Sequence, residues 1–193
     1  MKRNQIQKMV GIALLMALVL VMQTIGGMIP PIGGVSISLV LIPIVIGAAV
    51  YGIGAGALLG ATFGVIVYIN CVTGADPGGA MVFHANPVLC FLVVMAKGIL
   101  AGVVSGVVYR ALSGKNAYLA MFVAALVCPL VNTGVFVVCM LTFFVDVLAA
   151  WAGGGAILGY VLTGLILANM LPEVLINIVF SPASARIAKA VKK

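Results

Sequence analysis

The sequence predicts an all-α integral membrane protein with six transmembrane helices, and three observations lead to this fold class. Of the 193 residues, 65% are hydrophobic and 7% are charged, unlike a soluble globular domain. Apolar segments alternate with clusters of Gly, Pro and polar residues. Lys and Arg residues gather in alternate connections, as topology signals do. We therefore expect one membrane domain over residues 1–193.

The first three predicted helices cover residues 9–27, 36–50 and 53–70. The first follows Lys8 as an apolar run without a small-residue cleavage pattern, so we expect a retained span and not a signal peptide. The second is short for a span of about 20 residues and contains Pro43, which favours a kink. A glycine-rich turn separates it from the third helix.

The last three predicted helices cover residues 88–110, 117–144 and 155–180. Asn86-Pro87 is a common start for a helix such as the fourth. Pro129 interrupts the fifth helix and Pro172 the sixth. Each proline removes a backbone hydrogen bond, so we expect extra hydrogen-bonding capacity at these depths.

Six spans place both termini on one side of the membrane, and the positive-inside rule identifies that side as the cytoplasm. Every Lys and Arg except Lys97 falls on the terminal side, whereas the opposite connections contain Asp76 and Asp146. We therefore expect cytoplasmic termini. The net charge of +7 then consists of topology signals and does not indicate nucleic-acid binding.

The sequence contains no motif that supplies chemistry or energy by itself. It lacks a Walker-type phosphate loop, an HExxH zinc motif and a GxSxG nucleophile elbow. One His and three acidic residues offer few catalytic sets, and the four cysteines form no CxxC pair. We expect neither an enzyme nor a cofactor or metal site. Active transport by this chain needs an ion gradient or a partner protein.

Lys97 is the most informative residue, because it interrupts the otherwise uncharged stretch from Pro87 to Tyr109. About ten residues of helix place it roughly 15 Å inside the apolar layer, near its middle. A charge there is costly unless it pairs or faces water, which predicts a functional side chain turned inward. An anionic ligand is one partner for it. A neutral amine, or an amine that snorkels along the helix, is the alternative.

The connection from Asn70 to Pro87 is the longest external one and is rich in polar residues, Gly and Pro. We expect a turn-rich, ordered loop that covers a ligand, with His84 and Asn86 able to hydrogen-bond to it. The alternative is a solvated loop in which Asn86 caps the fourth helix.

Polar residues also occur inside the last two predicted helices. Asn132 and Thr133 fall in the outer half of the membrane, where they either contact a ligand or bond to a neighbouring helix. Asn169 and Glu173 lie nearer the terminal side of the sixth helix. A direct Lys97–Glu173 pair then requires a tilted helix, and a pair with Arg110 or contact with a partner fits the depth better.

Small residues recur every fourth position in several helices. Gly56, Gly60 and Gly64 form such a stripe in the third helix, and Ala13 and Ala17 form a pair in the first. Similar stripes begin at Gly98 and Gly155; we expect both of these to pack inside the subunit. Small residues let helices approach closely in lipid, either within one chain or between subunits.

Five features occur in a fixed order along the chain: Ala13-x-x-x-Ala17, Ser38 to Gly47 with its following turn, Ala85-Asn86-Pro87, Asn132-Thr133, and Asn169-x-x-Pro172-Glu173. In this order they resemble the substrate-binding S components of energy-coupling-factor (ECF) vitamin transporters, over most of the chain. The chain is most similar to the pantothenate type, whose ligand is a small carboxylic acid.

The resemblance implies a vitamin site in the outer half of a prokaryotic plasma membrane, under the connections between helices 1 and 2 and helices 3 and 4. It also implies partners: a transmembrane scaffold subunit and two cytoplasmic ATPases, besides membrane lipid. Ala13 and Ala17 are then expected to dock on the scaffold, with Gly56, Gly60 and Gly64 extending the docking face.

These inferences favour a substrate-binding and translocation subunit. Its proposed ligand contacts are Lys97 for a carboxylate, with Asn132, Thr133, Asn70, Asn86, Asn169 and, in the gate, His84. The alternative is a stand-alone secondary transporter driven by protons or sodium, which needs an ionisable coupling group.

Overall fold

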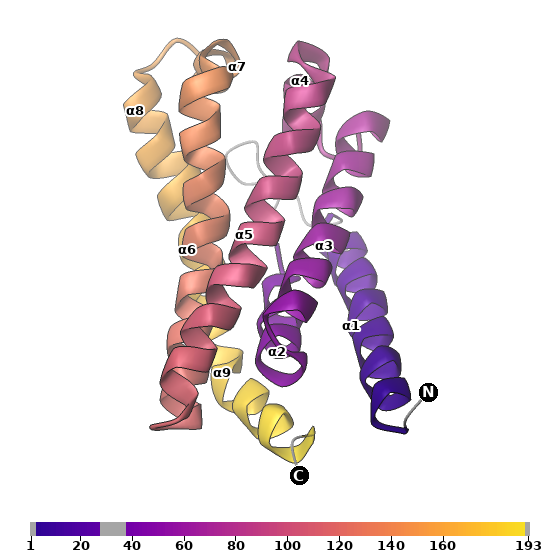
Figure 1. The fold of residues 1–193 in the computed structure, drawn as a ribbon. Coiled ribbons are helices and arrows are strands. Elements are labelled where there is room, and N and C mark those ends of the chain that lie inside the picture. The colour runs from indigo at the N-terminus through magenta and orange to yellow at the C-terminus, as the bar shows by residue number, and fades with distance from the viewer. Residues whose placement is uncertain (1–2, 28–37, 192–193) are drawn as a thin grey trace.

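The computed structural model describes residues 3–27 and 38–191, and these are almost entirely helical (Figure 1). The elements are α1 (Arg3–Gly27), α2 (Leu41–Tyr51), α3 (Ile53–Thr73), α4 (Pro77–Ala85), α5 (Pro87–Ser113), α6 (Ala117–Phe143), α7 (Val145–Trp151), α8 (Ile157–Tyr160), the π-helix η1 (Val161–Met170) and α9 (Leu171–Val191). The long helices form a bundle, with α4 and α7 at the end opposite the chain termini. The all-α prediction is confirmed for this part of the chain.

Five helices are long and apolar enough to cross a membrane: Gln5–Gly27, Ile53–Thr73, Pro87–Ser113, Ala117–Phe143 and the continuous Ile157–Val191. The other predicted span, 36–50, starts outside the described residues and corresponds to α2. At 11 residues, α2 is about 16 Å long, roughly half of a 30 Å hydrocarbon core. The structure thus has five candidate spans and one short apolar helix.

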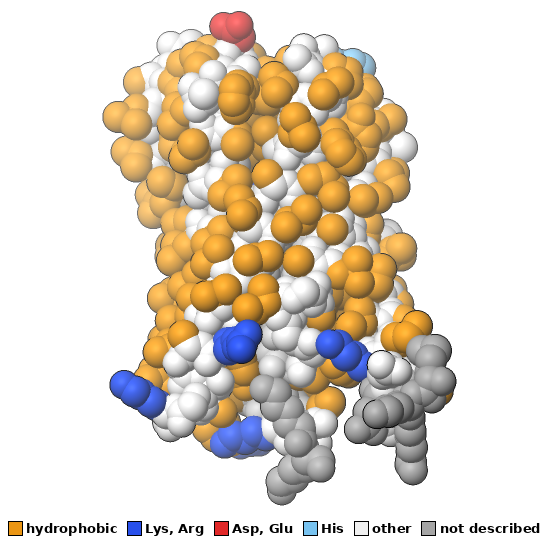
Figure 2. Space-filling model, in the orientation of Figure 1, with side chains coloured by type: hydrophobic (Ala, Val, Ile, Leu, Met, Phe, Trp, Pro, Cys, Tyr) orange, Lys and Arg blue, Asp and Glu red, His pale blue; other side chains and the backbone are white. Residues whose placement is uncertain are grey.

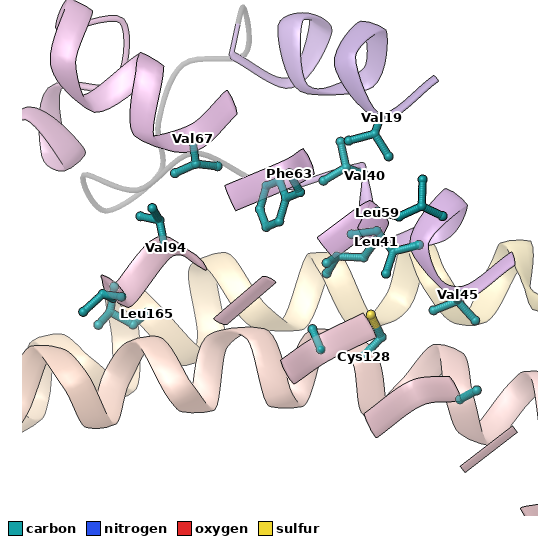
Figure 3. Close-up of a cluster of buried hydrophobic side chains, with 14 of the residues drawn as sticks. Val19, Val40, Leu41, Val45, Leu59, Phe63, Val67, Val94, Cys128 and Leu165 are labelled. Atoms are coloured by element: carbon teal, nitrogen blue, oxygen red, sulfur yellow. The ribbon is translucent and has the colours of Figure 1, made fainter. Parts of the chain in front are cut away.

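The short helix α2 lies in the interior, in the half of the bundle near the termini (Figure 1). It contacts α1, α3, α5, α6 and α9. Its sequence is apolar on all sides, which is the pattern of a helix surrounded by others. Figure 3 shows Leu41 and Val45 of α2 in a buried cluster with Leu59 and Phe63 of α3. One residue, Gly52, with φ +98°, joins α2 to α3.

Helices α3 and α5 pack with their backbones almost in contact. A Cβ atom on Gly60 would collide with the Gly98 carbonyl, and one on Gly56 would lie 2.6 Å from the Gly102 carbonyl oxygen. Glycines permit this close approach. A Cβ atom on Gly64 would likewise lie 2.8 Å from a carbonyl oxygen of α5. Gly56, Gly60 and Gly64 are thus buried against α5 within the chain, which is the internal packing that a small-residue stripe also permits; their predicted part in a docking face stays a prediction.

The predicted external loop between residues 70 and 87 is mostly helical. Helix α3 continues to Thr73 and ends at Gly74, whose φ of +76° is left-handed. Pro77 then starts α4, in agreement with the preference of proline for the first turn of a helix. The glycines that suggested turns lie inside α4 instead, where burial of Gly78 and Val82 against the bundle stabilises the helix.

The last span is longer than the predicted 155–180 and contains a π-helical segment, η1. The Leu171 N–H donates to the carbonyl of Ile166, five residues back. Pro172 follows directly and has no N–H to donate, so a regular α-helical ladder is interrupted there. Such segments occur often at functional sites in other proteins. Here the segment carries the buried side chain of Asn169.

The outside of the bundle is apolar between two polar ends. Figure 2 shows hydrophobic side chains over the visible face, Lys and Arg at the end near the termini, and an acidic side chain at the opposite end. Helix α1 is the least covered span, with 17% of its most apolar window buried. Its residues Ala13 and Ala17 are exposed. The surface is that of a multi-pass membrane protein.

Candidate functional site

A cavity of about 210 Å³ lies between α1, α3 and α5, beyond the N-terminal end of α2. It is lined by Gln23, Thr24, Gly27, Ser38, Ile66, Val67, Asn70, Ala75, Asp76 and Lys97. Because α2 fills only the half of the interior near the termini, the other half has room for this cavity. Pockets for drug-sized ligands measure about 300–1,000 Å³, so this cavity suits a small metabolite.

Lys97 reaches the cavity from the middle of α5, with 8% of its surface exposed. Its Nζ atom lies 4.9 Å from the ring centroid of Phe136 and 5.5 Å from that of Phe63. Aromatic faces attract a cation but do not neutralise it. In the described part of the chain no carboxylate lies within the 4.0 Å of an ion pair, so the Lys97–Glu173 pair does not form. The ammonium therefore has capacity for an anion.

Two residues that line the cavity each carry a buried side-chain oxygen without a hydrogen-bond partner in residues 3–27 and 38–191: Gln23 Oε1 and Asp76 Oδ1. Gln23 is 5% exposed, and a buried amide oxygen without a partner is costly. Asp76 occupies the N-cap position of α4, yet its side chain makes no capping hydrogen bond. Both oxygens thus have unused capacity to accept a hydrogen bond, and both are buried.

A smaller space of about 30 Å³ continues from the cavity toward α4 and α7. It shares Val67, Asp76 and Lys97 with the larger cavity. Its other walls are apolar or aromatic and include Phe136 and Trp151. The complete site therefore combines one cation, a few oxygen acceptors and an apolar end.

A second set of polar side chains is buried between α6 and the last helix, and it lines neither of these spaces. Its members are Asn132, Thr133, Asn169, Glu173 and Asn177. Glu173 Oε1 accepts a 2.7 Å hydrogen bond from the backbone N–H of Ser38, a residue on the cavity wall. Asn177 Nδ2 donates to the Glu173 carbonyl at 2.8 Å. The Glu173–Ser38 hydrogen bond connects the residues just before α2 to α9.

The remaining predicted site residues separate into two groups. Asn70 lines the cavity, three turns of helix from Gly60 on the same element. Asn86 accepts hydrogen bonds from the N–H groups of Val88 and Leu89, at 3.1 and 3.0 Å, which is the capping alternative. His84 is exposed in the last turn of α4 and packs edge-on against Phe83. Neither Asn86 nor His84 belongs to the cavity lining.

Sequence reasoning missed Gln23 and Ser38 and did not assign Asp76 to the site. The signal for Gln23 was present, since it is a large polar residue near the outer end of an apolar helix. The positions of Ser38 and Asp76 depend on the tertiary fold. The connection between helices 1 and 2, expected to cover the site, lies largely outside the described residues.

Residues 3–27 and 38–191 contain no group of three His, Cys, Asp or Glu side chains that could hold a metal ion. The Lys97 ammonium lies among apolar side chains, where the local dielectric constant is low. A charge-assisted hydrogen bond from this ammonium to the carboxylate of an organic acid is strong in such a place.

The chain was compared with known proteins. The family model described as "ECF transporter, substrate-specific component" matches residues 7–184. No curated protein matches the chain.

Proposed function

Because the chain belongs to the family of ECF transporter substrate-specific components, we propose that it captures a small carboxylate vitamin, with pantothenate favoured. Members of the family are substrate-binding components of transporters and not enzymes. They work with a membrane scaffold and ATPases. The chain delivers its ligand by reorienting when it is docked on a scaffold subunit with two cytoplasmic ATPases.

The burial of Lys97 on a cavity carries this proposal. A buried ammonium costs several kcal/mol unless it is neutralised, and no described carboxylate pairs with it. A ligand carboxylate supplies the missing charge inside the cavity. Asn70 on the same wall offers an amide to the polar part of the ligand.

The other predicted contacts have indirect roles in this proposal. Asn132, Thr133 and Asn169 support the wall formed by α6 and the last helix, where they are buried. The predicted ligand contacts of His84 and Asn86 stay part of the proposal, although neither residue lines the cavity and Asn86 caps α5.

For the membrane arrangement, we propose six crossings with cytoplasmic termini, in which α2 forms the short crossing. The basic end of the bundle in Figure 2 then faces the cytoplasm, and the cavity lies in the outer half of the membrane. Ala13 and Ala17 dock on the scaffold, which their exposure on α1 permits.

A proton- or sodium-coupled transporter is the second candidate, favoured by the buried carboxylate of Glu173. Its Oε2 atom has no hydrogen-bond partner, so it can take a proton. This candidate predicts uptake by the chain alone in vesicles with an ion gradient, whereas the ECF proposal requires the ATPase module.

The test is to purify the full chain in detergent, identify co-purified small molecules by mass spectrometry, and measure pantothenate binding by calorimetry. A stoichiometric carboxylate vitamin supports the proposal. If nothing co-purifies and neither pantothenate nor another carboxylate vitamin binds, the proposal fails. Uptake without the module would instead select the ion-coupled transporter.

A further inference from the structure

The cavity contains acceptors that a carboxylate cannot satisfy. A carboxylate has no hydrogen to donate, so it can pair with Lys97 but not with Gln23 Oε1 or Asp76 Oδ1. Placed near Asp76, it would also be repelled. Lys97 and these two oxygens therefore require different parts of a ligand.

Gln23 is a buried polar residue on the wall of the cavity. It belongs to the last turns of α1, is 5% exposed, and lines the cavity. The neighbouring Thr24 hydroxyl is already used, because it donates to the Leu20 carbonyl at 2.9 Å. An amide buried to this degree normally bonds through its oxygen, so the missing partner of Gln23 is informative.

Asp76, between α3 and α4, provides a second and independent observation of the same kind. Its backbone is fixed at both ends, since its N–H donates to the Asn70 carbonyl at 3.2 Å and its carbonyl accepts from Ala80 at 2.8 Å. Its side chain could cap α4 but does not. Asp76 also lines the small space beside Lys97, and its buried Oδ1 atom has no hydrogen-bond partner among the described residues.

We propose that Gln23 and Asp76 select acids that carry a hydroxyl or an ammonium group as a hydrogen-bond donor away from the carboxylate. This inference rests on the proposed function, because Lys97 must first hold the carboxylate. Gln23 accepts from the donor through Oε1, and Asp76 accepts a second bond through Oδ1. Simple fatty acids of the same size are then rejected, since they leave both buried oxygens unpaired.

The test uses calorimetry on the full chain with three probes. Pantothenate carries hydroxyl donors, N-(3,3-dimethylbutanoyl)-β-alanine has the same carbon skeleton without those hydroxyls, and 6-aminohexanoate carries an ammonium. We expect pantothenate to bind at least about tenfold more tightly than the analogue without hydroxyls. Tighter binding of 6-aminohexanoate than of pantothenate would identify the donor as an ammonium.

The variants assign the selectivity to residues. Gln23→Leu should weaken pantothenate binding about tenfold and leave the analogue without hydroxyls unchanged. Asp76→Asn should reduce 6-aminohexanoate binding more than pantothenate binding, because it removes a charge but keeps an acceptor. Gln7→Leu is the matched control, since Gln7 is exposed on the same helix, far along the chain from the cavity.

Two results overturn the inference, and they are distinguishable. If Gln23→Leu keeps the wild-type ratio between pantothenate and its analogue, and Asp76→Asn weakens 6-aminohexanoate no more than pantothenate, the ligand does not bond to these oxygens, while the proposed function stands. If no acid binds the wild-type chain, the proposed function fails and the inference fails with it.

Discussion

Two groups of polar side chains lie inside this apolar bundle, and they differ in whether a cavity reaches them. Lys97, Gln23 and Asp76 border empty space. Asn132, Glu173 and their neighbours are also buried, but they line neither the main cavity nor its small extension. Burial of polar groups in a membrane protein is therefore not sufficient to identify a ligand site. The adjoining cavity distinguishes the group around Lys97, for which we propose ligand binding, from the group around Glu173, which supports the fold.

The length of α2 accounts for this difference. Its 11 residues fill the interior only in the half near the termini. In that half, α2 and the glycine contacts between α3 and α5 occupy the interior, and a separate cavity of about 530 Å³ lies beside the C-terminal end of α2, at Tyr51, Tyr109 and Arg110. Beyond the start of α2, the helices α1, α3 and α5 enclose the cavity that Lys97 reaches. Substitutions in the two regions should consequently affect different measurements, stability in one and binding in the other.

The largest expected effect belongs to the packed region. Gly60→Leu should destabilise the fold by about 3 kcal/mol, because the new side chain meets the backbone of α5, which cannot move aside. Thermal unfolding in detergent measures the change. Gly134→Leu is the matched control, since the space around Gly134 is open and the residue is exposed. Equal stability of the two variants would contradict the close α3–α5 packing.

Lys97→Ala should act on binding. We expect a loss of about 1.5 to 3 kcal/mol in the affinity for a carboxylate ligand, the range for hydrogen bonds to charged groups. The melting temperature should not fall, because an unpaired buried charge is removed. Calorimetry with wild type, Lys97→Ala and the exposed control Lys115→Ala provides the comparison. Unchanged affinity in Lys97→Ala would remove Lys97 from the site.

Glu173→Leu should mainly reduce stability. The Ser38 N–H loses its 2.7 Å acceptor, and an unsatisfied buried donor costs about 1 to 3 kcal/mol. Glu173→Gln keeps an acceptor and should recover most of that loss. Melting temperatures of both variants, with and without pantothenate, show whether Glu173 stabilises the fold or binds the ligand. A selective loss of binding at wild-type stability would instead move Glu173 into the recognition group.

Ala13→Leu should have the smallest effect on the isolated chain. Ala13 is exposed on α1, so a larger apolar side chain there disturbs neither the packed region nor the cavity. If α1 docks on the scaffold, the same change should prevent assembly and uptake while binding stays normal. Co-purification with the scaffold tests this. Normal assembly of both Ala13→Leu and Ala17→Leu would argue against the docking face.

The sequence predicted the parts of this architecture that depend on local patterns. Apolar segments placed α3, α5 and α6 within about three residues at each end, but the first helix begins six residues earlier and the last ends eleven residues later than predicted. The depth argument anticipated that Lys97 turns inward. Sequence reasoning was wrong about the segment that forms α4, because Gly78 and Gly79 resemble a loop until the burial of this segment is known. It also could not tell whether the Gly56 stripe packs on α5, as the structure shows, or on another subunit.

The site was harder to predict than the fold, for a physical reason. Gln23, Ser38 and Asp76 come from separate elements, and only the packing of those elements brings them to one cavity. Asn86 and Asn132 have equally polar side chains, yet one caps a helix and the other is enclosed between helices. Side-chain chemistry alone could not distinguish these outcomes.

The most direct test of the central claim is a double-mutant cycle between Lys97 and the ligand carboxylate. Calorimetry would compare pantothenate with pantothenol, in which an alcohol replaces the carboxylate, for wild type and Lys97→Ala. The account predicts that the wild-type chain prefers pantothenate by about tenfold or more and that Lys97→Ala loses this preference. An equal preference in both proteins would show that Lys97 does not bind the carboxylate and would contradict the account.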